Sequence, residues 1–83
     1  MEYGIAYRIL KAIEILHLYN KPCRLTDILR QSKMGFGAYQ RVREELIETG
    51  LIEKKGNSVY ITDKGQDFFS RLKELNEIVK VTK

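Results

Sequence analysis

The chain contains one histidine and one cysteine, His17 and Cys23, and these are its most reactive side chains. One thiol excludes an intramolecular disulfide, and this pair supplies too few ligands for a zinc site. Neither residue stands with the partners of a catalytic triad, and no glycine-rich phosphate-binding loop follows a strand. We expect His17 on the buried side of a helix and Cys23 as a small buried hydrophobe, with an intersubunit disulfide as the alternative. The sequence therefore predicts no catalytic activity, cofactor or metal site.

The elements that position the remaining polar side chains are marked by two changes of periodicity within residues 39–65, YQRVREELIETGLIEKKGNSVYITDKG. Apolar residues first recur at helical spacing, which indicates a half-buried helix that stops at Gly50. Residues 51–55 and 58–62 then form two short strand candidates around a turn. Thr62 can cap a last helix, which continues with a long apolar stripe.

This order of signals resembles the second half of a winged helix-turn-helix DNA-binding domain, as in the small MarR-like and PadR-like regulators common in archaea. The resemblance rests on GLI after the helix and ITDKG before the last one, and it covers residues 5–79. It implies an α+β, mostly α fold with a three-helix core, a two-stranded β-wing and a C-terminal dimerisation helix. The predicted single domain, 1–83, contains helices 3–19 and 26–32, a recognition helix 36–49, a wing 51–62 and a C-terminal helix 63–80.

The recognition helix of such a domain presents its N-terminal half to base edges in the major groove. An amide can pair with adenine and a guanidinium can bind guanine through two hydrogen bonds, so Gln40 and Arg41 are the main candidates. The predicted base-reading residues on the outward face are Gly37, Gln40, Arg41 and Glu44. In the alternative interpretation, the arginines of this helix pair with its own glutamates on a solvated face.

Phosphate contacts position a DNA-binding protein without reading sequence. The residues predicted to contact or flank phosphates are Arg30, Lys33, Phe36 and Arg43. Arg43 stands where many family members keep an apolar residue, so its stem could also pack at the edge of the core.

The wing places Lys54, Lys55 and Asn57 at or near its tip, and the resemblance implies that they reach a minor groove or flanking phosphates. So short a wing is expected to add salt-sensitive affinity more than specificity. Alternatively, these lysines only keep a polar hairpin soluble. Residues 23–25 could add a short strand that pairs with the wing.

Apolar residues exceed what one small core needs to cover, in both the first and the last predicted helix. The last helix has the spacing of a coiled-coil seam, and Asn76 beside it could set the register of a pair. Two-fold pairing explains this excess, although scattered exposed apolar residues are an alternative. The predicted dimer-interface residues are Ile5, Ile9, Ile15, Phe68, Leu72, Leu75, Asn76 and Val79.

A net charge of +4 over 83 residues permits a polyanionic partner. The N-terminus lacks a signal-peptide core and no apolar run is long enough for a membrane span, which predicts a cytoplasmic protein. The sequence thus predicts a homodimeric, sequence-specific transcriptional regulator of double-stranded DNA, with promoter occlusion as the simplest mechanism. The alternatives are an architectural, chromatin-like DNA-binding protein and an interaction module that has lost DNA binding. So small a regulator also resembles those of archaeal viruses and plasmids.

Overall fold

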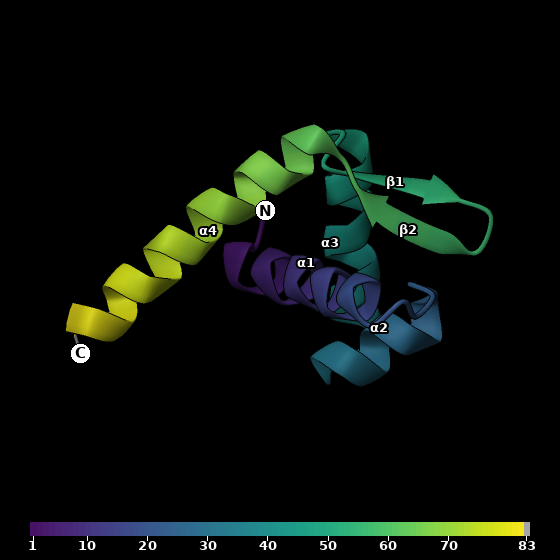
Figure 1. The fold of residues 1–83 in the computed structure, drawn as a ribbon, viewed down its shortest axis with the longest axis horizontal. Helices are drawn as coiled ribbons and strands as arrows, with labels where there is room; N and C mark the ends of the chain where they lie inside the picture. The colour runs from purple at the N-terminus through teal and green to yellow at the C-terminus, as the bar shows by residue number, and fades with distance from the viewer. Residues whose placement is uncertain (83) are drawn as a thin grey trace.

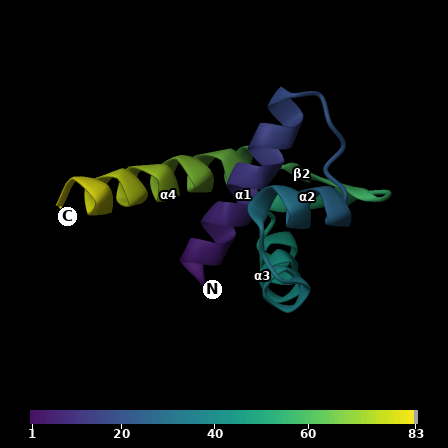
Figure 2. The same cartoon turned by 90° about the horizontal axis from the view of Figure 1, so that it is seen from below.

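Helices and one antiparallel β-hairpin make up the computed structural model, which describes the backbone of residues 1–82 and the side chains of residues 1–77. In chain order the elements are α1 (Tyr3–Leu18), α2 (Leu25–Ser32), α3 (Phe36–Glu48), β1 (Ile52–Lys55), β2 (Ser58–Ile61) and α4 (Asp63–Thr82). The hairpin points away from one side of the helical body and α4 runs away from the other (Figures 1 and 2). This is the mostly helical winged architecture that the sequence predicted.

Helix ends follow local backbone chemistry. The α1 helix ends at Leu18, one residue before the predicted end, and the chain then turns through Asn20 in the left-handed region at φ 55°. The α3 helix ends at Glu48, and Gly50 follows with φ 75°, as expected for a glycine just beyond a helix. The short strand expected at residues 23–25 is reduced to a single bridge between Arg24 and Ser58.

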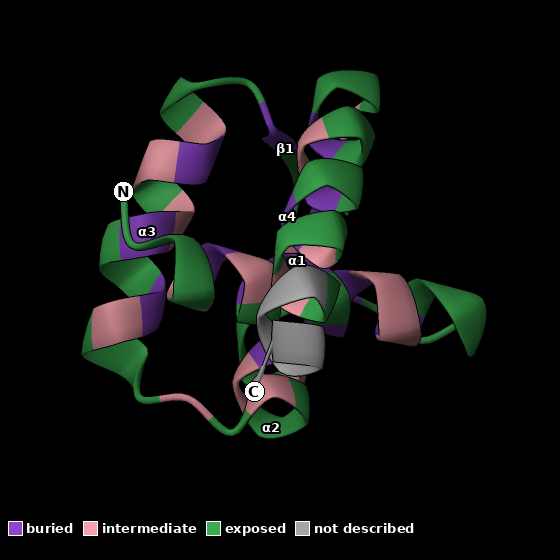
Figure 3. Ribbon diagram, turned by 90° about the vertical axis from the view of Figure 1, so that its left-hand side faces the viewer, coloured by how far each residue is buried: buried purple, intermediate pink, exposed green. Residues whose placement is uncertain are grey.

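The core is built around α1, whose buried side chains recur at helical spacing. This helix packs against α2, α3, α4 and the hairpin strand β2. Buried residues come from α1 (Ala6, Ile9, Leu10, Ala12, Ile13, Leu16), α2 and the loop before it (Cys23, Ile28), α3 (Tyr39, Val42, Leu46), the wing (Leu51, Ile52, Val59) and α4 (Phe69, Leu72). Each large apolar side chain in this set contributes roughly 1.5–3 kcal/mol by leaving water. Figure 3 shows buried and exposed segments alternating along α3, as a half-buried helix requires.

The start of α4 is joined to the end of α3 through Thr62, as the predicted cap requires. The Thr62 hydroxyl accepts a hydrogen bond from the Gly65 N–H (3.0 Å) and donates one to the Gly50 carbonyl (2.6 Å). Gly65 packs so closely that a Cβ there would lie 1.9 Å from the carbonyl oxygen of Leu51. Lys64 also donates to the Thr49 carbonyl (2.9 Å). These contacts set the direction in which α4 leaves the body.

The register of the hairpin decides which wing side chains face the helices. Lys54 pairs with Val59, and Lys55 pairs with Ser58 across a turn in which Gly56 has φ 61°. Because side chains alternate along a strand, Lys54 shares the α3-facing side with the buried Ile52. Lys55 lies on the other side, with its ammonium 5.7 Å from the ring centre of Tyr60.

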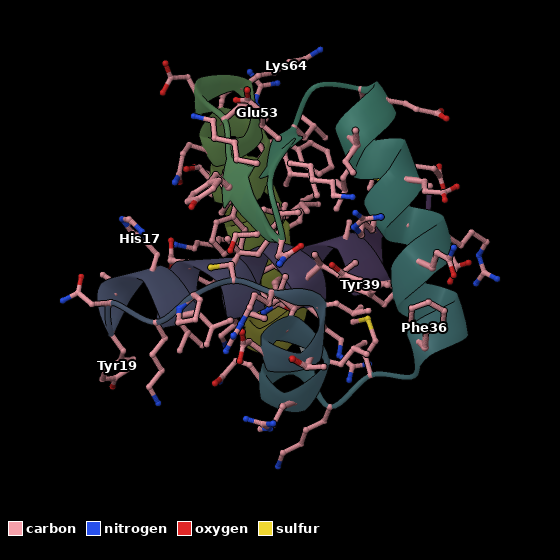
Figure 4. The ribbon with its side chains drawn as sticks, turned by 90° about the vertical axis from the view of Figure 1, so that its right-hand side faces the viewer. His17, Tyr19, Phe36, Tyr39, Glu53 and Lys64 are labelled. Carbon is pink, nitrogen blue, oxygen red and sulfur yellow. The ribbon has the colours of Figure 1, made fainter. Side chains whose placement is uncertain are left out.

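Two sequence predictions about the core are wrong. His17 is exposed rather than buried, because the last turn of α1 extends beyond the elements that cover its earlier turns (Figure 4). Ile9 and Leu72, predicted at a dimer interface, are buried in the core of the single chain. Cys23 is a buried free thiol, as expected, and burial raises its pKa.

Candidate nucleic-acid interface

A groove of about 420 Å³ lies where the N-terminal ends of α2 and α3 meet the wing. Its polar side chains come from three separate parts of the chain: Arg24 and Thr26 at the start of α2, Gln40 and Arg43 on α3, and Lys54 and Asn57 on the wing. Figure 4 looks onto this side of the molecule, with the hairpin, α2 and α3 arranged around it. Cationic and amide groups are thus gathered on one concave surface.

One side of α3 forms the wall of the groove. Phe36, Gln40 and Arg43 are four and three residues apart, so they lie above one another on the same helix face. Tyr39, beside them, is 2% exposed and anchors the helix to the core. The helix begins after Gly35, whose extended backbone lets the chain enter α3 directly from the turn. The buried anchor and the polar wall are therefore adjacent faces of one helix.

Tyr39 and Arg43 influence each other at the base of this wall. Burial raises the pKa of the Tyr39 hydroxyl, and the nearby positive charge of Arg43 acts in the opposite direction. Arg43 is itself half-buried, so its stem packs against the domain edge while it still lines the groove. The phosphate-contacting and core-edge interpretations of Arg43 are therefore compatible.

Arg24, which the sequence interpretation missed, enters the groove as the residue that caps α2. Its backbone N–H (3.2 Å) and its Nε (2.8 Å) both donate to the Asp27 carboxylate. The hydrogen bond from Arg24 is the main reason that the pKa of Asp27 is lowered. An acidic residue three positions after a helix cap was the available signal, but placing the helix start at residue 26 rather than Leu25 hid it.

The wing residues divide between the two faces of the hairpin. Lys54 and Asn57 line the groove, whereas Lys55 lies on the opposite face against Tyr60. The reason is the two-residue period of a strand, which places neighbouring lysines on opposite sides. Of the three predicted wing contacts, the structure brings two together with α3.

Arg41 does not line the groove. One step of about 100° beyond Gln40 turns it toward the N-terminal residues, where its Nη2 lies 2.7 Å from the Glu2 carboxylate. The N-terminal amine lies 3.5 Å from Glu45 on the same flank. The sequence analysis gave pairing of Arg41 with a glutamate of its own helix as an alternative. In the structure its partner is instead Glu2, in the segment before α1.

The other predicted DNA contacts lie on exposed surface outside the groove. Gly37 and Glu44 are exposed on the outermost face of α3, between the groove and the Arg41 flank. Arg30 and Lys33 are exposed at the end of α2, and Lys33 has φ 55° as its C-cap. Arg8 of α1 donates to the Ser32 (2.6 Å) and Lys33 (3.1 Å) carbonyls. That role for Arg8 could be recognised only from the packing of α1 on α2.

The remaining residues of the predicted dimer interface whose side chains are described range from half-buried to exposed. Leu75 is 59% exposed, and Phe68 is half-buried with its ring centre 6.2 Å from that of Tyr3. Ile5, Ile15 and Asn76 are also partly exposed. Val79 lies outside the residues whose side chains are described.

Three helices followed by a hairpin that flanks the third helix define the winged helix-turn-helix class. The chain belongs to this family, because the family model described as winged helix-turn-helix matches residues 2–80. A search of curated protein sequences found no match. Family membership indicates a DNA-binding domain, while the MarR-like or PadR-like affiliation and the archaeal source stay predictions. Over the described part of the chain, no helix has both the length and the apolar character needed to cross a membrane.

Proposed function

We propose that the protein is a sequence-specific regulator that binds double-stranded DNA as a homodimer and represses transcription by occluding a promoter. The observation that supports this best is the groove, where α3, the α2 cap and the wing bring together Gln40, Arg43, Arg24 and Lys54. Base edges are read by amides and guanidinium groups, while phosphates are bound by cations around them. The groove contains both kinds of group.

Within this proposal, Gln40 and Arg43 read bases and Arg24 and Lys54 contact phosphates. Gln40 and Arg43 stand on α3, the helix that such domains insert into the major groove. Arg24 remains 55% exposed in its side chain although it pairs with Asp27, so its guanidinium can still meet a phosphate. This assignment gives Arg43 the base-reading role that the sequence prediction gave to Arg41, and it leaves Arg41 outside the contact surface.

Dimerisation is supported by α4. The helix has 20 residues and a length of about 30 Å, and the longest dimension of the whole chain is 40 Å. Its apolar face begins in the core at Phe69 and Leu72 and continues outward to the exposed Leu75. A second copy packed on this face would bury Leu75 and place two recognition helices for half-sites about 34 Å apart.

Fluorescence anisotropy with selected and random duplexes over a salt series tests DNA recognition. We expect binding of the selected site to exceed random binding by about a thousandfold or more. The double variant Arg43→Glu, Lys54→Glu should abolish this binding, whereas the exposed Lys21→Glu, outside the groove, serves as a single-charge control. Equal and steeply salt-dependent binding of both duplexes would instead support the architectural function. Absence of binding at low salt would support a protein-interaction module.

Light scattering tests the dimer separately. The wild-type mass should be twice that of one chain, and Leu75→Glu should yield monomers because a carboxylate would be buried in the contact. Leu18→Glu, at a leucine on the end of α1 that is 69% exposed compared with 59% for Leu75, is the matched control and should remain dimeric. A monomeric wild type, or a dimeric Leu75→Glu, would contradict pairing through α4.

A further inference from the structure

Phe36 is the one large apolar side chain of α3 that is mostly outside the core. It is the first residue of the helix, lines the groove and is 52% exposed. Tyr39, three residues later, is almost fully buried and already anchors the same turn. Phe36 is absent from the core and from the partly buried residues packed against it. Its ring therefore contributes little to holding α3 in place.

The ring also lacks an aromatic partner among the described side chains. The two ring pairs join Tyr3 with Phe68 and Tyr7 with Phe69, both between α1 and α4. On either side of Phe36 stand Gly35 and Gly37, and a Cβ at either position would meet nothing within 4 Å. The phenyl ring thus lies at the N-terminal end of α3 (Figure 4), between two glycines that add no side chain beside it.

A phenyl ring has no hydrogen-bond donor for an anion, so a phosphate contact at this position would come from the free backbone N–H at the start of α3 and not from the side chain. In the major groove, an apolar side chain instead finds the C5-methyl group of thymine, which is the apolar feature of the base edges there. Gln40 lies one helical turn further along the same face, where its amide can pair with adenine.

We propose that Phe36 is a specificity-determining residue that reads the methyl group of a thymine next to the base contacted by Gln40. This inference rests on the proposed DNA-binding function and adds a preferred base to it. The bare backbone at Gly35 and Gly37 lets the start of α3 approach the base edges closely enough for the ring to reach a methyl group. Wedges that unstack bases are a feature of minor-groove binding, whereas α3 enters the major groove.

Deoxyuridine differs from thymidine only by this methyl group, so it gives a direct test. In the selected operator, each thymine is replaced in turn by deoxyuridine and the Kd is measured by fluorescence anisotropy. We expect one thymine per half-site at which the replacement weakens wild-type binding about fourfold, the effect of one methylene-sized group returned to water. The Phe36→Ala variant should bind the two duplexes equally, and Phe36→Leu should retain part of the difference.

Tyr19→Ala provides the matched control, since Tyr19 is an aromatic residue 71% exposed at the end of α1 and outside the groove. It should keep the full thymine preference, and circular dichroism should show all variants folded. Equal wild-type binding of every duplex pair, or a thymine preference that survives in Phe36→Ala, would overturn the inference. Either result would leave the proposed function standing, because specific binding to the unmodified operator is measured in the same titrations.

Discussion

The two flanks of α3 carry similar side chains but have different surroundings. On one flank, Gln40 and Arg43 face a groove that they share with the wing and the α2 cap. On the other, Arg41 and Glu45 face the N-terminal residues and form ion pairs with them. The comparison shows that exposure alone does not decide what a charged side chain of α3 faces. The neighbouring segment that the helix face meets decides whether the side chain lines the groove or forms an ion pair.

The difference between the flanks is one of charge balance as well as position. Both partners of the Arg41–Glu2 pair are more than half exposed, so the pair adds little to stability and is weakened by salt. Its main effect is to neutralise Arg41 locally. In the groove, by contrast, Arg24, Arg43 and Lys54 bring three positive charges together, and Asp27 is paired with only one of them. A polyanion would be attracted to the groove side.

The largest expected effect is on the packing that holds both flanks in place. Gly65→Ala would force a Cβ against the Leu51 carbonyl and displace α4 from the wing, with a cost of about 3 kcal/mol for an overpacked site. Thermal unfolding should show a Tm lowered by about 10 °C or more. Gly37→Ala, in open space on α3, is the control and should raise stability by about 0.5–1 kcal/mol. A Gly65→Ala protein as stable as wild type would contradict this packing.

The next prediction compares the two arginines directly. Arg43→Gln should weaken binding to the selected operator by about tenfold or more, because it removes a two-donor contact to a base. Arg41→Gln should change the affinity by less than about threefold, as expected for an exposed paired charge. Fluorescence anisotropy at one salt concentration measures both. The reverse order would restore Arg41 as the base-reading arginine and would mean that its pair with Glu2 opens on DNA.

The contact between Arg24 and Asp27 at the start of α2 predicts that the stability of the protein depends on pH. The pKa of Asp27 is lowered in the folded state, mainly by the hydrogen bond from Arg24. The ionised carboxylate therefore stabilises the protein above the pKa of an unfolded aspartate, about 4, and this contribution is lost as pH falls through the folded value. Asp27→Asn should lower the Tm at pH 7, and the difference from wild type should shrink below about pH 4. A constant difference across this range would show that the carboxylate charge is not responsible.

The smallest expected effect comes from removing the Glu2 carboxylate that pairs with Arg41. Glu2→Gln should increase DNA affinity by less than about twofold, since an exposed ion pair is weak and Arg41 lies outside the groove. The slope of the logarithm of the binding constant against the logarithm of the salt concentration should become steeper by less than one additional phosphate contact would produce. If affinity instead rose about tenfold, the N-terminal residues would be blocking a real contact.

Much of the fold could be predicted from local sequence because local chemistry determines it. The Gly50 helix end, the Thr62 cap and the hairpin around Gly56 each depend on residues close together in the chain. Helix ends differed from prediction by one or two residues, as at Tyr19, which was predicted inside the first helix but is the C-cap of α1. The family match along residues 2–80 confirms the fold that these signals indicated.

The site was less predictable, because it depends on contacts between distant segments. Periodicity identified the outward half of α3, but that half is wider than the groove and includes both Gln40 and Arg41. The wing meets only one side of it, and the residues before α1 meet the other. The strand expected at residues 23–25 indicated pairing with the wing, but only the folded bridge between Arg24 and Ser58 brings Arg24 to the groove.

The sequence by itself determined where the helices and the hairpin lie to within one or two residues, and that the chain has the winged helix-turn-helix order. Only the tertiary structure decided which flank of α3 faces the wing, that Ile9 and Leu72 belong to the core and that Phe36 remains exposed. The physical reason is the range of the interactions. Caps, turns and periodicity act within a few residues, whereas burial and ion pairing depend on segments that meet only after the chain has folded.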